Sequence, residues 1–229
     1  MSRSGMGDGR RPASLVKILV LLSLLCPLVF LVAVFGTRLG AWSLSFGFEV
    51  LALQVGRVLA WVGAAAALQA VVLALRHLRQ AGIYAAVAVV AAVGSLAAYQ
   101  VQLARYAAPG GADVTTDAAE PPAFSRAVMA ERGGVQTRPQ TCSGLEPVMR
   151  QVAPETASYA MREAGFTALG TAAFRADGYR ESFWFGQVHH VAIRIRPGRT
   201  DVRVAARYPV PAGDEACRLA RAVVAQLQP

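Results

Sequence analysis

Residues 18–35 read ILVLLSLLCPLVFLVAVF, a run of 18 residues without a charge. Two further uncharged runs follow at residues 58–75 and 81–104. An 18-residue helix covers about 27 Å at 1.5 Å per residue, close to the roughly 30 Å hydrocarbon core of a bilayer. Helices that pack in water show a polar stripe, and these runs show none. The sequence therefore predicts three membrane-spanning helices.

The composition supports this prediction. Of the 229 residues, 55% are hydrophobic and 16% are charged, and the mean hydropathy is +0.40. These values are too apolar for a soluble domain of this size. Nine of the 23 basic residues and two of the 14 acidic residues precede residue 112, so this part carries +7 of the formal charge of +9. Because this charge flanks apolar runs and forms no basic helix, nucleic acid is not an expected partner.

The first apolar run has a competing interpretation as a secretory signal peptide, because Arg10, Arg11 and Lys17 precede it. Its apolar core is longer than that of most signal peptides, and residues 33–35 match the small-x-small cleavage signal poorly. The residues after Arg10 and Arg11 also fit a twin-arginine export signal badly. We expect an uncleaved anchor.

Basic residues in the flanks of the spans predict the orientation. Two lie on one side, Arg38 and Arg105, and six lie on the other: Arg3, Arg10, Arg11, Lys17, Arg76 and Arg79. The positive-inside rule then places the amino terminus in the cytoplasm and the segment after the third span outside. In a Gram-negative cell this predicts an inner-membrane protein with a cytoplasmic tail (residues 1–14), a three-span region (15–111) and a periplasmic domain (112–229).

Charged residues in the second span raise the question of transport, because charges inside a membrane are costly. Arg57 lies short of the middle of residues 46–75, so its side chain can extend to the outer interface and meet Glu49. We favour this interpretation over a transport or proton-relay role.

The exported part has the size of one small α+β domain. Residues 117–122 predict the start of a short helix that reaches residue 132, and residues 154–165 predict a second helix. Two hairpins follow: strands 166–174 and 180–185 around a turn at 176–179, then strands 188–196 and 201–208 around a turn at 197–200. Asp214 and Glu215 open a final helix.

The second hairpin separates an apolar face from a basic one. In its first strand, His189, Val191, Ile193 and Ile195 alternate with His190, Ala192, Arg194 and Arg196. In its second strand, Val202, Val204, Ala206 and Tyr208 alternate with Arg203, Ala205 and Arg207. The order of the elements predicts an antiparallel sheet with helices packed on the apolar face.

Two of the three cysteines, Cys142 and Cys217, fall in the part predicted to lie outside, whereas Cys26 lies in the first span. In an oxidising compartment this predicts a disulfide that stabilises the domain by roughly 4 kcal/mol. The alternative is a reactive thiol, but Cys142 has no helix start, histidine or C-x-x-C pattern beside it.

Two segments carry a resemblance to a known family. Asp113-Val114-Thr115-Thr116-Asp117, followed by Pro121-Pro122-Ala123-Phe124, resembles the opening signature of the bacterial family called domain of unknown function 1499. Residues 191–197 and 201–207 resemble its late hairpin, with an arginine pair at a spacing of four. The family often has two acids where this chain has His189 and His190. The resemblance implies the domain architecture and carries no established activity.

Catalytic motifs are absent from the sequence. His189 and His190 are adjacent and so point to opposite faces of a sheet, and neither H-E-x-x-H nor paired C-x-x-C occurs. Ser143 and Ser182 lack the G-x-S-x-G elbow, and no glycine loop for phosphate is present. We therefore expect no metal, no cofactor and no catalytic residue.

The candidate ligand-binding residues are the arginines of the basic sheet face together with two acids of the signature segment: Arg194, Arg196, Arg203, Arg207, Asp113 and Asp117. Such a face can hold an anionic ligand, a lipid headgroup or a carboxylate of a partner. The alternative, which we favour, is a solvated face on which an Arg–Asp pair orients the signature segment.

These observations predict a non-catalytic protein of the cell envelope that organises the envelope or binds a protein partner or an anionic lipid. The alternative is an envelope enzyme that acts on lipid or cell-wall material with Asp113, Asp117 and the arginine face.

Overall fold

The computed structural model describes residues 10–75, 78–107, 111–135, 137–208 and 213–228. The predictions that concern residues 1–9, Arg76 and Pro109-Gly110 lie outside these ranges. The chain forms two compact units, Met1–Leu103 and Ala104–Pro229. We describe each unit by itself.

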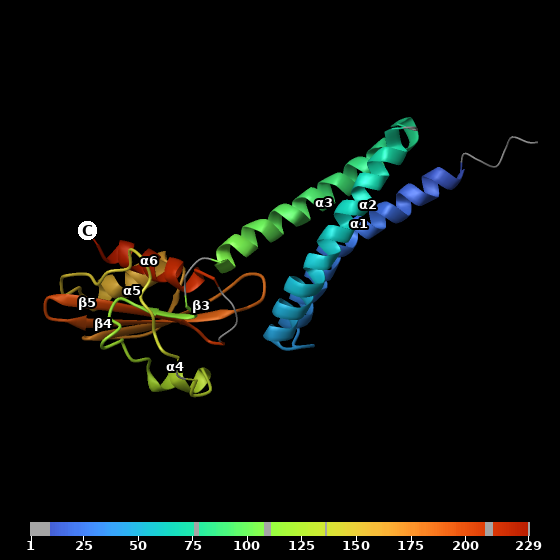
Figure 1. Ribbon diagram of the computed structural model, residues 1–229. Coiled ribbons are helices and arrows are strands. Elements are labelled where there is room, and N and C mark those ends of the chain that lie inside the picture. The colour runs from blue at the N-terminus through green and yellow to red at the C-terminus, as the bar shows by residue number, and fades with distance from the viewer. Residues whose placement is uncertain (1–9, 76–77, 108–110, 136, 209–212, 229) are drawn as a thin grey trace, which may run out of the picture. The chain divides into compact units, whose positions relative to one another are not determined.

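The first unit is helical (Figure 1). Its elements are α1 (Arg10–Arg38), the π-helix η1 (Phe46–Val55), α2 (Gly56–Leu75) and α3 (Leu78–Ala107). Three helical stretches are long and apolar enough to cross a membrane: Ser14–Arg38, Phe46–Leu75 and Ala81–Gln102. The prediction of three apolar helices is confirmed.

Small residues form the packing surface between these helices. Ala66, Ala70 and Ala74 of α2 are buried in one cluster with Ala85 and Ala88 of α3, and valine and leucine side chains of α1 complete it. A spacing of three or four residues keeps the alanines on one helix face, where they let backbones approach closely.

The apolar pattern gave no sign of the π-helical winding of η1. The Tyr99 hydroxyl donates to the carbonyl of Ala52 within this segment, and the Cys26 thiol donates to the carbonyl of Gly56 at 3.5 Å. Glu49 is half-buried and Arg57 is exposed. The structure records no ion pair between these two residues, so the contact that we expected is not formed.

The second unit contains a five-stranded antiparallel sheet in the order β1-β5-β4-β3-β2. The strands are β1 (Asp113–Thr115), β2 (Thr167–Ala172), β3 (Arg175–Glu181), β4 (Val188–Arg196) and β5 (Arg199–Ala206). The predicted α+β class with an antiparallel sheet is confirmed. Strand β1 was not predicted: the signature segment itself pairs with β5, with Asp113 opposite Ala205.

Helices cover both faces of the sheet. Helices α5 (Pro154–Glu163) and α6 (Glu215–Leu227) lie on one face, whereas α4 (Arg126–Glu131) lies on the other (Figure 1). The core beneath α5 and α6 contains the apolar residues of β4 and β5 as predicted. On the opposite face, Ala192 and Ala205 are buried with Phe124 and Val128, so this face is partly covered rather than solvated.

The predicted start of the first helix is wrong. Helix α4 begins after Ser125, whose hydroxyl accepts the N–H of Val128 at 3.3 Å. The segment before it is held by the sheet: the Asp117 carboxylate accepts from Arg194 at 3.2 Å, and the carbonyl of Pro122 accepts from Arg203 at 3.1 Å. These polar groups are therefore used against the sheet and not to cap a helix.

The predicted turn at residues 176–179 is also wrong, because the chain turns at Ala173-Phe174. Asp177 lies inside β3, where its carboxylate accepts from Arg175 at 2.7 and 3.0 Å. A Cβ on Gly178 would lie 2.8 Å from the carbonyl oxygen of Thr167 and 3.3 Å from the sulfur of Met161. This glycine therefore serves close packing beneath α5.

Candidate functional site

The predicted ligand-binding residues fall into two separate side-chain clusters on the sheet face that α4 partly covers. The first, which we call the Asp113 cluster, consists of Asp113, Phe124, Arg132, Thr137 and Arg203. The second, which we call the Asp201 cluster, consists of Asp117, Glu120, Arg194, Arg196, Arg199 and Asp201. Arg207 belongs to neither: its Nε donates to the carbonyl of Glu131 at 2.8 Å.

The Asp113 cluster is built on a two-point ion pair between neighbouring strands. Arg203 donates from Nε to Oδ1 of Asp113 at 2.9 Å and from Nη2 to Oδ2 at 2.6 Å. The Asp113 side chain is 2% exposed and that of Arg203 is 12% exposed. Thr137 donates to the same carboxylate. This geometry anchors β1, the entry of the chain into the domain, to the late hairpin.

A second arginine gives the Asp113 cluster an excess positive charge. Arg132 is buried, donates to the carbonyl of Ala206 at 2.7 Å, and lies over the Phe124 ring at 5.0 Å. Arg203 also lies against this ring, at 4.6 Å. Burial lowers the pKa of Arg132 while Asp113 opposes the change. Phe124, Arg132 and Arg203 line a surface hollow, where an anion would meet two guanidinium groups.

The Asp201 cluster joins three arginines to three acids. Asp201 is fully buried and accepts from Arg194 at 3.2 Å, Arg196 at 2.7 Å and Arg199 at 2.7 Å. Asp117 lies 3.2 Å from each of the same three arginines. The arginine charge that the sequence places at this end of the hairpin is therefore matched by acids of the same domain.

The environment of Asp117 stabilises its ionised form. The N–H of Glu120 lowers the pKa of Asp117 and outweighs partial burial, and Arg199, Arg196 and Arg194 lower it further. A carboxylate held in this state accepts hydrogen bonds and is a poor proton donor near neutral pH. This argues for a structural part in holding the signature segment on the sheet.

Several residues of these clusters were missed by reasoning from the sequence. Asp201 and Arg199 were read only as hairpin residues, although the register of the Pro197-Gly198 turn places Asp201 opposite Arg194. That register could have been used to pair the two side chains. Arg132, the C-cap residue of α4, and Thr137 follow this helix, and no local pattern indicates their approach to β5.

The two histidines lie on opposite sides of the sheet, as predicted. His190 packs edge-to-face on Phe124, with ring centroids 6.4 Å apart, and lies 3.8 Å from Glu131. His189 is surrounded on the other side by the charges of Glu215, Arg180 and Arg218. Within the described ranges, no group of three or more His, Cys, Asp or Glu side chains could hold a metal ion.

Burial lowers the pKa of each histidine to about 4. For His189, Glu215 opposes this change, and Arg180, Arg218 and His190 add to it. For His190, Glu131 opposes it, and Arg132 and Arg207 add to it. Both imidazoles are therefore neutral in the folded domain at pH 5, whereas an unfolded chain would bind protons there.

We expect the domain to lose stability as the pH falls from 7.5 to 5. Below about pH 6.5 the unfolded state binds more protons than the folded state, so the free energy of unfolding falls, by about 2 kcal/mol per histidine at pH 5. Amide hydrogen exchange of β4 and β5 in the full-length protein in detergent, corrected for intrinsic rates, measures this change. His190→Phe should remove about half of the pH dependence; an unchanged dependence in this variant would refute the assignment.

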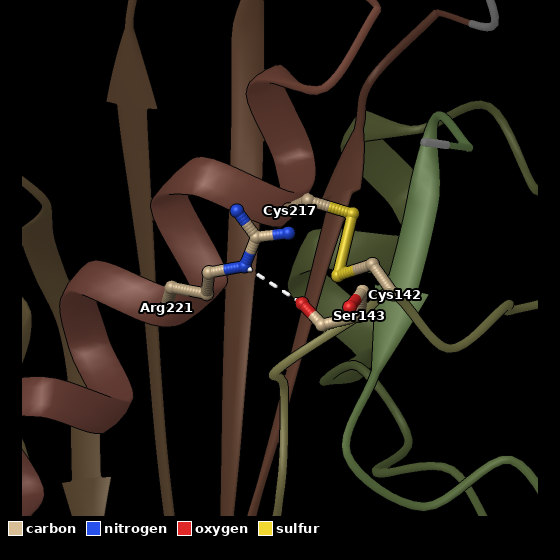
Figure 2. The surroundings of a disulfide bond; sticks show 4 residues. All are labelled: Cys142, Ser143, Cys217 and Arg221. Atoms are coloured by element: carbon tan, nitrogen blue, oxygen red, sulfur yellow. Dashed lines mark hydrogen bonds between the residues drawn. A yellow bond between two sulfur atoms is a disulfide. The ribbon is translucent and has the colours of Figure 1, made fainter. Parts of the chain in front are cut away.

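The predicted disulfide joins Cys142 and Cys217, whose Cα atoms lie 6.1 Å apart (Figure 2). It connects the loop before α5 to the first turns of α6. One turn further along α6, Nε of Arg221 donates to the carbonyl of Ser143 at 3.1 Å, as Figure 2 shows. Both sulfur-bearing side chains are buried in the main core. The loop is therefore fixed to the helix by a covalent bond and a hydrogen bond.

Comparison of the chain with family models, curated proteins and solved structures finds no match.

Proposed function

We propose that the chain is an inner-membrane protein with a cytoplasmic amino terminus and that residues 112–229 form a periplasmic domain. Two observations support this placement. The basic residues in the flanks of the apolar helices are concentrated on one side. The Cys142–Cys217 disulfide is of a kind that persists in oxidising compartments and is rare in the cytosol.

We further propose that the domain has a non-catalytic role in which it binds an envelope protein or an anionic lipid. The supporting observation concerns the two acids that an enzyme would use. Asp113 is 2% exposed and Asp117 is 11% exposed, and both carboxylates are paired with arginines. The hollow beside Phe124 and the neighbouring Arg207 offer positive charge to an anionic partner. Membership of the family called domain of unknown function 1499 is part of the same proposal, because its two signature segments pair through Asp113 and Arg203.

Two fusions made at the same position and expressed in parallel test the proposed orientation. Alkaline phosphatase fused after Pro229 should be active and green fluorescent protein fused there should be dark, because the first folds only outside the cytoplasm and the second only inside. A fluorescent, phosphatase-negative pair would overturn the proposed orientation.

Photo-crosslinking from the domain surface tests the binding role. A benzoylphenylalanine in place of Val135, which lines the hollow beside Phe124 and is 38% exposed, should give an adduct with a lipid or an envelope protein. The matched position is Arg162, an exposed residue of α5 on the opposite sheet face, which should give none. Equal yields at both positions, or no adduct at either, would contradict a specific binding surface.

A further inference from the structure

The loop between β3 and β4 exposes aromatic side chains to solvent. We call residues 182–187 the aromatic loop because they contain Phe183, Trp184 and Phe185. Phe183 is 80% exposed and Trp184 is 51% exposed, and their rings pack edge-to-face with centroids 5.3 Å apart. Phe185 is 9% exposed. Two large apolar rings at the tip of a loop are unfavourable in water and favourable at an apolar boundary.

The register of the sheet places this loop at the end where the chain enters the domain. Asp113, the first residue of β1, lies opposite Ala205 near the end of β5, and Ala205 lies opposite His190 near the start of β4. Glu181, the last residue of β3, pairs with Val188, the first of β4. The start of β1 and the aromatic loop therefore share one end of the sheet.

The connection from the apolar helix to this end is short. The apolar stretch of α3 ends at Gln102, and α3 continues to Ala107. Five helical residues add about 7.5 Å of length, and the six-residue step to Asp113 adds at most about 20 Å. Strands β1 and β3 are three places apart in the sheet, about 14 Å. A bilayer crossed by α3 is thus within reach of the loop.

The same end of the sheet carries further groups suited to the boundary between lipid and water. Tyr208, just beyond β5, is 51% exposed, and the guanidinium of Arg207 lies 5.8 Å from its ring. Trp and Tyr concentrate at the headgroup level of membranes because one part of each side chain is apolar and the other polar. Arginine beside them can contact lipid phosphates.

We propose that the aromatic loop inserts into the lipid interface of the membrane that the chain's own helices span, and that it holds this end of the sheet against the bilayer. The proposal rests on the proposed membrane location. It adds a lipid-contacting site to the domain, formed by Phe183 and Trp184 and flanked by Tyr208.

Depth-dependent fluorescence quenching tests the proposal in the full-length protein reconstituted into phosphatidylcholine and phosphatidylglycerol vesicles. The chain has three tryptophans, so Trp42→Phe and Trp61→Phe leave Trp184 as the reporter. Lipids brominated near the top of the acyl chain should quench Trp184 about twofold, while aqueous iodide should quench it weakly. Phe183→Ser in the same background should reduce the quenching by the brominated lipids.

The matched control uses the turn at the opposite end of the sheet. Phe174, in the two-residue turn between β2 and β3, is 66% exposed and is separated from the aromatic loop by the seven residues of β3, about 20 Å. With Trp184→Phe and Phe174→Trp, the reporter should be insensitive to brominated lipids and readily quenched by iodide.

Three results would overturn the inference. The first is that iodide quenches Trp184 and brominated lipids do not. The second is that the tryptophans at positions 184 and 174 are quenched alike. The third is that neither quencher reaches Trp184, which indicates a contact with protein. In each case co-flotation of the protein with the vesicles shows that the membrane anchor is intact, so the proposed membrane location survives. Loss of flotation overturns that location and the inference with it.

Discussion

Replacement of Cys142 and Cys217 by serine is expected to lower the free energy of unfolding of the domain by about 4 kcal/mol. The bond closes a loop of 75 residues that contains α5 and all of β2 to β5. Without it, the unfolded chain gains the conformational freedom of that loop while the folded core keeps its apolar contacts. An effect of this size is a large fraction of the stability of a domain of this length.

Amide hydrogen exchange of α6 and of the loop around Cys142 in the full-length protein measures the loss. The matched variant is Cys26→Ser, which changes a cysteine that is free in the structure and lies in α1. It should leave exchange in the domain unchanged. If the double variant exchanges like the unmodified protein, or if the purified protein has three free thiols without reduction, the stabilising role of the bond is wrong.

Asp201→Ala is expected to cost about 3 kcal/mol, because it removes a fully buried carboxylate from three arginines. The loss is at the lower end for a buried ion pair. The arginine side chains are 21% to 35% exposed, so water can replace part of what they lose. The β4–β5 hairpin should be the region in which protection against exchange falls most.

Two further substitutions separate charge from hydrogen bonding. Asp201→Asn keeps the size of the side chain and one acceptor, and should cost less than Asp201→Ala. Glu120→Ala removes the acid of the same cluster that is 70% exposed, and should cost under about 1 kcal/mol. Equal losses for Glu120→Ala and Asp201→Ala would contradict the central place of Asp201 in this cluster.

These measurements would separate the arginines that stabilise the fold from those that are available to a partner. Arg194, Arg196 and Arg199 are matched by acids, so their removal should act through stability. The Asp113 cluster and Arg207 retain positive charge that no described acid balances fully, so they are the part of the face where an anionic partner is expected. The candidate arginine face is thereby divided into a structural cluster and a smaller surface that we propose for a partner.

Local sequence patterns were sufficient to predict several of the helices and strands. Strict alternation over residues 188–196 and 201–208, with Pro197-Gly198 between them, predicted β4 and β5 because a sheet with one apolar face imposes a period of two. Pro154 and Gly165 bounded α5, and the acidic first turn located α6. Cys142 and Cys217 could be paired from the sequence because the third cysteine, Cys26, lies in an apolar helix.

Other features could not be predicted because they depend on contacts distant in the sequence. Asp177-Gly178 has the composition of a turn, yet the packing of Met161 and the approach of the Thr167 carbonyl place it inside β3. Asp117 and the two prolines resemble the start of a helix, yet the arginines of β4 and β5 hold the segment on the sheet. In both cases tertiary contacts outweighed a weak local preference.

The sequence by itself determined the three apolar helices, the late hairpin and the cysteine pair, since each depends on hydrophobic periodicity or on residue type within a short window. Only the tertiary structure decided that residues 113–115 of the signature segment form a strand and that the Asp201 carboxylate pairs with three arginines. It also decided that the loop of Phe183 and Trp184 shares a sheet end with the entry of the chain. Strand order and register bring together residues up to about ninety positions apart, and no local pattern contains that information.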